Sequence, residues 1–503
     1  MDSEIRRQPP GATTGNRSSG RGTKQGAGKW MVLSAVSLGT FMSTLNASIV
    51  NISLPTLAND FDVSIPDIEW VVVAFLLATG ALLLTFGRLG DIVGYKRVYV
   101  AGFVIFTLAG VLCGLSQSVA ELVGLRVLQG VGAGMVQAIG PAIVTATFSP
   151  QERGKALGLN GMSVAVGLAL GPTLGGILTD WLSWRWIFFV NLPVGVFGVL
   201  WALRVLSDRG ADDSRRQRFD PLGATLGSGA LFALLLALSE GSSWGWGSFE
   251  TIGLFAIFVL LGVAFIVTEL RVTQPMLDLK LFTIRSFSAG NTSLLIAFAA
   301  LFAANFLLPF FLERGQGLSA LESGLLLTPL PLAILLVAPL SGALSDRIGS
   351  QIPSTAGLTI LAVGLLSLTG VGAETGHWGL IWRFAMVGTG MGLFNSPNQS
   401  SIMGSVPRPR LGIASGMISQ MRYTGQALGI AVGGAVIASR MPVHIQNLTG
   451  TLSQPLIERE AFILAMHDAF YVGSAICVVG IFTSLIRGRK KPEDTGSPDI
   501  PSN

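Results

Sequence analysis

The amino-acid sequence predicts an all-α polytopic membrane protein of fourteen transmembrane helices, arranged as two related six-helix bundles with two helices inserted between them. The composition, a succession of apolar runs and an internal repeat each predict this class. Half of the 503 residues are hydrophobic and only 12% are charged, whereas soluble proteins carry about 25% charged residues. Because so few charges cannot cover a water-soluble surface, we expect most of the chain to lie in a lipid bilayer.

Fourteen apolar runs follow a basic N-terminal segment. A transmembrane helix needs about 20 predominantly apolar residues. The runs of this length lie near residues 31–53, 68–87, 98–117, 122–148, 156–178, 187–206, 223–240, 250–269, 288–312, 323–344, 354–371, 379–404, 413–438 and 466–487. The first run, from Trp30 to Leu54, is longer than the apolar region of a signal peptide. We therefore interpret it as a transmembrane helix and disfavour a cleaved leader.

Two features of the first half recur in the second. The segment from Gly87 to Arg97, between the second and third runs, is rich in glycine and charge. Four of its residues recur 255 positions later, since Gly87, Leu89, Asp91 and Gly94 are matched by Gly342, Leu344, Asp346 and Gly349. An Arg followed by alternate glycines begins at Arg126 and again at Arg383. Runs 1–6 therefore correspond to runs 9–14, an arrangement typical of secondary transporters.

The repeat divides the chain into five predicted regions. They are a disordered cytoplasmic tail (1–29), an N-terminal six-helix bundle (30–206), a linker with two inserted helices (207–287), a C-terminal six-helix bundle (288–487) and a second cytoplasmic tail (488–503). The longest loop is expected at about residues 439–465. It carries no recognisable catalytic group, which disfavours a membrane enzyme or sensor.

The Lys and Arg residues predict the orientation. With the N-terminus inside, 26 of the 33 Lys and Arg residues fall in inner segments and only Arg185, Arg314, Arg440 and Arg459 fall in outer ones. Inner loops of membrane proteins carry an excess of Lys and Arg. We therefore predict a multi-pass protein of the cell membrane with both termini in the cytoplasm. The basic residues are dispersed among loops, so nucleic acid is not an expected partner.

Several motifs together resemble those of a known transporter group. In chain order they are Leu45 to Pro55, Gly87 to Arg97, the Arg126 motif, the glycines from Gly167 to Gly176, and Trp184 to Pro193. They are similar to the major facilitator superfamily and, within it, to the fourteen-span drug:proton antiporter family of QacA and EmrB type. The resemblance covers roughly residues 30–490. It implies the major facilitator fold, export rather than uptake, and exchange for protons.

The fifth run contains Gly167, Gly171, Pro172, Gly175 and Gly176. Glycine lets another backbone approach closely, and proline removes a helical hydrogen bond. These residues by themselves fit either tight packing or a helix that bends during transport. The resemblance implies the second, a conformational role.

The segment between the second and third runs contains Gly87, Arg88, Asp91, Gly94 and Arg97. The positive-inside bias and a tight turn are sufficient to explain its basic residues. Asp91 adds nothing to that bias, so we expect it to bind a helix N-terminus or an Arg of the other bundle. The resemblance implies that these five residues lock an inner gate. Asp346 belongs to the weaker copy of the motif, because the position equivalent to Arg88 is occupied by Ala343.

Arg126 lies within the fourth run. An unpaired Arg at the bilayer centre costs about 3 kcal/mol, which favours a functional role. The alternative is that its side chain extends to the outer interface, near Glu121. The resemblance implies a link to proton movement.

Asn46 departs from the resemblance, which places an Asp at this position for cation recognition or proton coupling. An amide cannot titrate, and the carboxylates considered, among them Glu121, Asp180 and Glu313, fall at the ends of runs or in loops. Proton coupling then depends on Arg126 with Asp91 or Glu313. Multivalent cations are also disfavoured as substrates, because nothing in the centre would neutralise them.

The remaining intramembrane polar groups are mostly amides. Many will bridge helices, and those of the first, twelfth and thirteenth runs are expected to line a central cavity. The predicted transport pathway comprises Asn46, Arg126, Asn191, Arg383, Asn395, Gln399, Arg422 and Gln426. This set suggests a neutral or anionic amphiphile.

The sequence therefore predicts a secondary active efflux transporter for lipophilic small molecules, working by alternating access and coupled to proton influx. A facilitator or a lipid or metabolite exporter of the same fold, without proton antiport, is the alternative. We expect a monomer in the lipid bilayer with no enzymatic activity, cofactor or metal, because no phosphate-binding loop, metal-ligand spacing or nucleophile–base pair is present.

Overall fold

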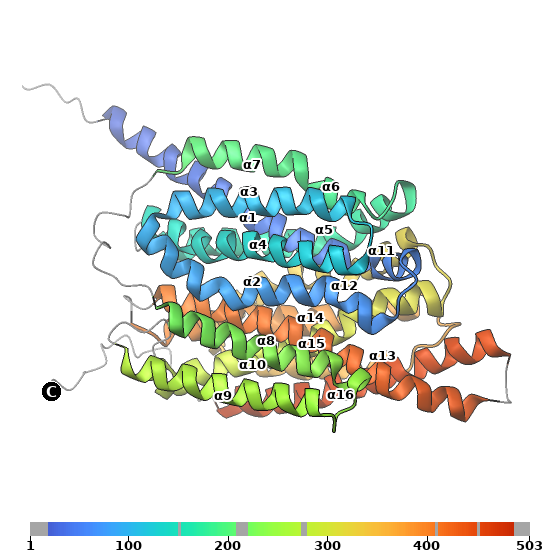
Figure 1. Cartoon of the computed structure of the whole chain (residues 1–503). Coiled ribbons are helices and arrows are strands. Elements are labelled where there is room, and N and C mark those ends of the chain that lie inside the picture. The colour runs from blue at the N-terminus through green and yellow to red at the C-terminus, as the bar shows by residue number, and fades with distance from the viewer. Residues whose placement is uncertain are drawn as a thin grey trace, which may run out of the picture.

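The computed structural model describes residues 19–148, 152–207, 220–272, 279–407, 411–449 and 453–486, and these residues form helices without a β-strand. The first six crossings are α1 (Ser19–Asp60), α2 (Ile65–Val93), α3 (Tyr95–Leu115), α4 (Val119–Thr147), α5 (Arg153–Trp181) and the pair α6 (Trp186–Phe189) and α7 (Asn191–Val205). The two inserted helices are α8 (Pro221–Trp244) and α9 (Phe249–Arg271). Figure 1 shows the long helices side by side and roughly parallel.

The second bundle begins with the short helix η1 (Leu279–Thr283). Its crossings are α10 (Arg285–Phe310) extended by the π-helix η2 (Phe311–Gly315), α11 (Ala320–Leu327) with α12 (Pro329–Ile348), α13 (Gln351–Leu368), α14 (His377–Gly404), α15 (Leu411–Leu448) and α16 (Gln454–Ile486). Pro329 begins α12 and lacks the N–H that a continuous helix needs, so the tenth crossing is broken there.

The two bundles have equivalent packing. In the first, α2 packs on α4 and α1 packs on α5; in the second, the corresponding helices α12 and α14 pack together, as do α10 and α15. The loop glycines are also equivalent. Gly94 has φ 105° and Gly349 has φ 84°, values at which a side chain would be strained. The predicted fold class, two six-helix bundles and two inserted helices, is confirmed.

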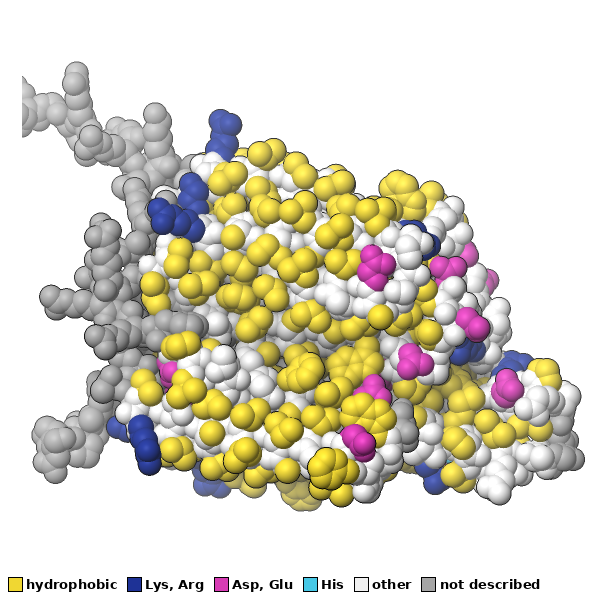
Figure 2. All heavy atoms as spheres, viewed as in Figure 1, with side chains coloured by type: hydrophobic (Ala, Val, Ile, Leu, Met, Phe, Trp, Pro, Cys, Tyr) yellow, Lys and Arg dark blue, Asp and Glu magenta, His cyan; other side chains and the backbone are white. Residues whose placement is uncertain are grey.

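Thirteen described stretches are long and apolar enough to cross a membrane. The predicted span 379–404 is absent from that set, although α14 is a helix of 28 residues, because its amides and hydroxyls lower its hydropathy. Side chains of α9 such as Leu260 and Val263 are exposed, as expected for a lipid-facing helix. Hydrophobic side chains cover the middle of the face shown in Figure 2, and most Asp and Glu side chains lie toward its right end.

We call the end of the bundles that holds the α2–α3 connection at Gly94 the basic end, and the other the opposite end. The described chain begins and ends at the basic end, because it crosses the bundle fourteen times. The inserted pair lies to one side, where α8 packs on both α2 and α15. One contact there is a hydrogen bond from Ser228 Oγ to the Ala81 carbonyl oxygen, 2.9 Å long.

Two predicted boundaries were wrong. Helix α1 starts at Ser19, inside the predicted disordered tail 1–29; no proline interrupts this stretch, and Lys29 Nζ binds Glu152 Oε1 at 2.6 Å. The predicted loop 439–465 is mostly helix, because α15 continues to Leu448 and α16 starts at Gln454. Asp468 of α16 holds this hairpin by accepting from Arg440 (2.7 Å) and by pairing with His444 (2.9 Å) on α15. Figure 1 shows the hairpin projecting beyond the other helices. Residues 1–18 and 487–503, which hold most of the predicted tails, lie outside the described residues.

Candidate transport cavity

A cavity lies between the two bundles. The first bundle contributes residues of α1 and α5 to its wall, and the second contributes residues of α10, α11, α12, α14 and α15. The space between the atoms that line the cavity measures about 850 Å³, a figure that includes the part open to solvent.

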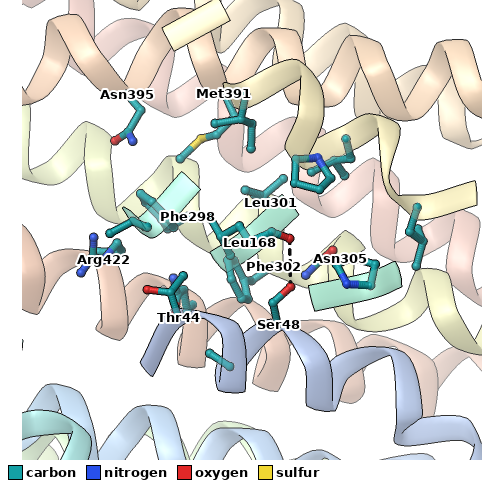
Figure 3. Close-up of a pocket in the computed structure, with 18 of the residues that line it drawn as sticks. Thr44, Ser48, Leu168, Phe298, Leu301, Phe302, Asn305, Met391, Asn395 and Arg422 are labelled. Atoms are coloured by element: carbon teal, nitrogen blue, oxygen red, sulfur yellow. Dashed lines mark hydrogen bonds between the residues drawn. The ribbon is translucent and has the colours of Figure 1, made fainter. Parts of the chain in front are cut away.

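The wall of the cavity is apolar with a few polar groups. Phe298, Leu301, Phe302 and Met391 form its centre in the view of Figure 3. The polar lining residues are Thr44, Ser48, Asn305, Asn395, Arg422, Tyr423 and Gln426. None of the described residues that line the cavity is an Asp or a Glu. The lining therefore combines an aromatic surface with hydrogen-bonding groups and a single positive charge.

Three residues of the predicted pathway line the cavity, namely Asn395, Arg422 and Gln426. Gln399 lies one helical turn further and donates from Nε2 to Asn395 Oδ1, 2.9 Å away. Arg383 does not line the cavity, because its Nε and Nη1 donate to the carbonyl oxygens of Ser367 (2.8 Å) and Gly379 (2.6 Å). Asn191 also lies elsewhere, and its Nδ2 donates to carbonyl oxygens of the preceding helical turn, 3.2 Å away.

The sequence analysis selected the wrong residue of α1 for the cavity. Thr44 and Ser48 line it, whereas Asn46 does not. Successive residues of an α-helix are rotated by about 100°, so positions four apart share a face and the position midway between them points away. The spacing of Thr44 and Ser48 within the recognised motif was the signal that could have identified this face.

Asn46 and Arg126 meet instead inside the first bundle, and both are fully buried. Arg126 of α4 donates from Nη1 to Asn46 Oδ1 and to Gln129 Oε1, each at 2.6 Å, and from Nε to the Val71 carbonyl oxygen at 2.8 Å. Its guanidinium lies 4.1 Å from the ring centroid of Phe75. Arg126 therefore links α4 to α1 and α2, and its side chain does not extend to Glu121 in the first turn of α4.

We expect Asn46→Asp to add pH dependence to transport. The new carboxylate would lie at the position of Asn46 Oδ1, 2.6 Å from Arg126 Nη1, where its ionisation alters the charge of a buried cluster. The measurement is the export rate over a pH series with the same pH on both sides of a liposome membrane. Asn46→Ser is the control, because it removes the amide without adding a titratable group. Identical pH profiles for Asn46→Asp and the wild type would contradict the prediction.

Two carboxylates lie at the contact between the bundles, and only that of Glu313 was considered for proton coupling from the sequence. Glu69, near the start of α2, is fully buried and lies against Gly434 of α15. Glu313, in η2, accepts a hydrogen bond from Thr56 Oγ1 of α1, with 3.4 Å between the oxygens. Both residues lie at the ends of apolar runs, where exposed side chains are expected, but the packing of the two bundles covers these ends. The carboxylates lie toward the opposite end.

The bundles are joined at the opposite end. A Cβ atom on Gly176 would lie 2.5 Å from the Ala320 carbonyl oxygen, and one on Gly324 would overlap the Pro172 carbonyl oxygen. The hydroxyl oxygens of Thr173 and Thr328 are 2.6 Å apart, and Arg314 Nη2 donates to Asn59 Oδ1 at 2.7 Å. Side chains larger than hydrogen at Gly176 or Gly324 are incompatible with this approach.

The glycines of the fifth crossing serve two contacts. Gly167, Gly171 and Gly175 face α1 of the same bundle, where a Cβ atom on Gly167 would lie 3.0 Å from the Leu45 nitrogen. Gly176 and the Pro172 carbonyl oxygen face α11 of the other bundle. Tight packing thus accounts for three of the glycines, and the contact between bundles involves Pro172 and Gly176.

The predicted inner-gate segment lies at the basic end. Gly94 ends α2 in the turn, and Gly90 packs against Ile139 and Tyr95. A Cβ atom on Gly87 would have no neighbour within 4 Å, and Arg97 is exposed. The side chains of Arg88, Asp91 and Asp346 lie outside the described part of the structure, so their gating role stays a prediction.

Two helical bundles around a cavity of this kind define the class of polytopic carrier proteins. The sequence profile of the Major Facilitator Superfamily matches residues 36–430. The chain belongs to this superfamily.

Characterised relatives cover most of the chain. The riboflavin transporter RibZ of Clostridioides difficile is 33% identical over 462 residues, which are 92% of this chain and 98% of RibZ. The multidrug resistance protein Stp of Mycobacterium tuberculosis is 35% identical, over 89% of this chain and 83% of Stp. The tetracenomycin C resistance and export protein of Streptomyces glaucescens is 29% identical, over 100% of this chain and 98% of that protein.

A solved structure has the same fold. It is a bacterial homologue of the human lysosomal transporter Spinster in an inward-facing, unoccupied conformation. It superposes with a TM-score of 0.66 at 16% identity, over 92% of this chain and 97% of that one.

Proposed function

We propose that this protein exports lipophilic small molecules across the cell membrane by alternating access, driven by proton influx. The observation that carries the proposal is the cavity between the bundles, combined with the close glycine contact that joins them at the opposite end. Separation of the opposite ends and approach of the basic ends would expose the same cavity to the other side. The similarity to the multidrug resistance protein Stp and to the tetracenomycin C resistance and export protein supports export of drug-like molecules.

The proposed orientation places the basic end and both termini in the cytoplasm. The excess of Lys and Arg in the connections of that end supports it. In this orientation the contact at Gly176 closes the outer end of the described conformation. An exporter must collect its substrate from the cytoplasmic side.

Glu69 and Glu313 are the proposed proton-binding groups. Asn46 cannot titrate, and the described lining of the cavity contains no carboxylate. Both glutamates lie at the contact between the bundles, where opening would expose them to water. Buried carboxylates inside membrane proteins are rare and commonly mark proton pathways.

Transport without proton antiport is the second candidate function. Asn46 at the position of the family Asp favours it, and the resemblance to RibZ, a riboflavin transporter, supports a metabolite as the substrate. The alternative keeps the fold, the cavity and the alternating bundles, and it removes only the coupling.

Gradient-driven transport tests the proposal. The purified protein is reconstituted in liposomes, and movement of a lipophilic fluorescent dye is followed with and without an imposed pH gradient. We expect dye movement against its concentration gradient that stops when an ionophore collapses the pH gradient. Dye movement that does not depend on the pH gradient would favour transport without proton antiport. Dye movement no faster than in protein-free liposomes would contradict both candidate functions.

The gate residues allow a paired prediction in the same assay. We expect Asp91→Asn to reduce export more than Asp346→Asn, because only the first copy of the loop contains an Arg, Arg88, at the matched position. The two substitutions remove the same charge at equivalent places, so each is the control for the other. Equal reductions would indicate a symmetric gate.

A further inference from the structure

The three Arg residues within the membrane-spanning helices differ in their partners. Arg126 donates to two side-chain oxygens and a carbonyl oxygen, and Arg383 donates to two carbonyl oxygens. Arg422 of α15 makes no hydrogen bond or ion pair with any described residue. Its guanidinium carbon lies 5.2 Å from the ring centroid of Tyr423. Arg422 also lines the cavity in which a transported molecule would bind.

Asn395 is a second lining residue that carries a donor group. Figure 3 shows Arg422 and Asn395 on the same side of the cavity, with Ser48 and Asn305 on the other side and the apolar residues between them. Asn395 Oδ1 already accepts from Gln399 Nε2 at 2.9 Å. The amide nitrogen of Asn395 donates to no described residue, so it is a donor that a ligand can use. This side of the cavity offers donors to an acceptor group that carries negative charge.

The middle of the cavity suits a ring system. The ring centroids of Phe298 and Phe302 are 6.3 Å apart, and both side chains line the cavity with Leu301 and Met391. Aromatic side chains stack with flat ligands and contribute a large apolar contact area.

We infer that the cavity selects an aromatic amphiphile with an anionic group, which binds Arg422 and Asn395 while its rings lie against Phe298 and Phe302. This inference rests on the proposed function, in which the cavity holds the transported molecule. A cationic ligand is disfavoured, because no described lining residue is an Asp or Glu and Arg422 would repel it.

Two dyes with the same xanthene ring system and opposite charge test the inference. Binding of anionic fluorescein and of a cationic rhodamine ester to the purified full-length protein is measured in detergent by fluorescence anisotropy, at mildly alkaline pH. We expect the wild type to bind fluorescein at least about tenfold more tightly than the rhodamine ester, the size of one charge-assisted hydrogen bond. Arg422→Gln should remove this preference without weakening rhodamine binding.

Two further variants separate charge from folding. Arg422→Lys keeps the charge and should retain most of the preference, whereas Arg285→Gln removes the charge of an exposed Arg at the start of α10 and should change nothing. A wild type that prefers the rhodamine ester, or binds fluorescein no better, overturns the inference whether or not Arg422→Gln folds. So does an unchanged preference in folded Arg422→Gln. Because binding is measured without a gradient, these results leave gradient-driven export to be decided by the liposome assay.

Discussion

Replacing Gly176 with valine is expected to abolish export. A Cβ atom at this position would lie 2.5 Å from the Ala320 carbonyl oxygen of α11, so the opposite ends of the two bundles could no longer close. Overpacking costs about 1–3 kcal/mol, and a free energy of this size shifts a two-state equilibrium about 5- to 150-fold. The variant would be held open at the opposite end. The measurement is the export rate per folded transporter in liposomes.

Gly161 provides a matched control on the same helix. A Cβ atom there would have no neighbour within 4 Å, so Gly161→Val adds the same side chain to α5 without touching the other bundle. We expect it to export at close to the wild-type rate. Wild-type export by Gly176→Val, or an equal loss in Gly161→Val, would show that the contact with α11 is not part of the transport cycle.

Replacing Arg126 with alanine is expected to reduce export by at least about tenfold. The substitution leaves Asn46 Oδ1, Gln129 Oε1 and the Val71 carbonyl oxygen buried without their donor. Hydrogen bonds to a charged group contribute about 1.5–3 kcal/mol each. The three contacts join α4 to α1 and α2, so their loss should loosen the bundle that supports Thr44 and Ser48 in the cavity wall.

Arg126→Lys distinguishes charge from geometry. Lysine keeps the positive charge, but it is a point donor and cannot reproduce the planar set of contacts that the guanidinium makes. We expect intermediate export, with the thermal stability of both variants measured in detergent to separate loss of folding from loss of function. Unchanged export by folded Arg126→Ala would exclude Arg126 from the mechanism.

The fold was predictable because its determinants are local. Apolar length places each crossing, and the glycines at 94 and 349 mark turns with positive φ that few other residues adopt. The ends of α15 and α16 were not predictable in this way. Contacts such as that of Arg440 with Asp468 extend the hairpin past the apolar run, and they depend on which helices are neighbours.

The site was predictable only in part, because a sequence shows the depth of a residue along a helix better than its direction. Arg422 and Gln426, one turn apart, were expected in the transport pathway, and both line the cavity. Arg383 was equally deep, but its side chain binds the carbonyl oxygens of Ser367 and Gly379. Glu69 was overlooked because it lies near a helix start. It is buried by packing against Gly434, a residue of the other bundle 365 positions away in the sequence.

The central claim is that the two bundles move in opposite senses at the two ends of the cavity. Two pairs of spin labels on α5 and on α11–α12 measure this by electron–electron double resonance. Trp181 and Leu325 are exposed positions at the opposite end, and Leu159 and Ile348 are exposed positions at the basic end. The native Cys113 and Cys477 are fully buried, so they need not be removed.

We predict that, in liposomes with substrate dye, a population appears in which the 181–325 distance is longer and the 159–348 distance is shorter than in the dye-free protein. Gly176→Val should show the longer 181–325 distance without dye. Distances that stay fixed at both ends during dye export, or that lengthen and shorten together, would contradict alternating access around this cavity.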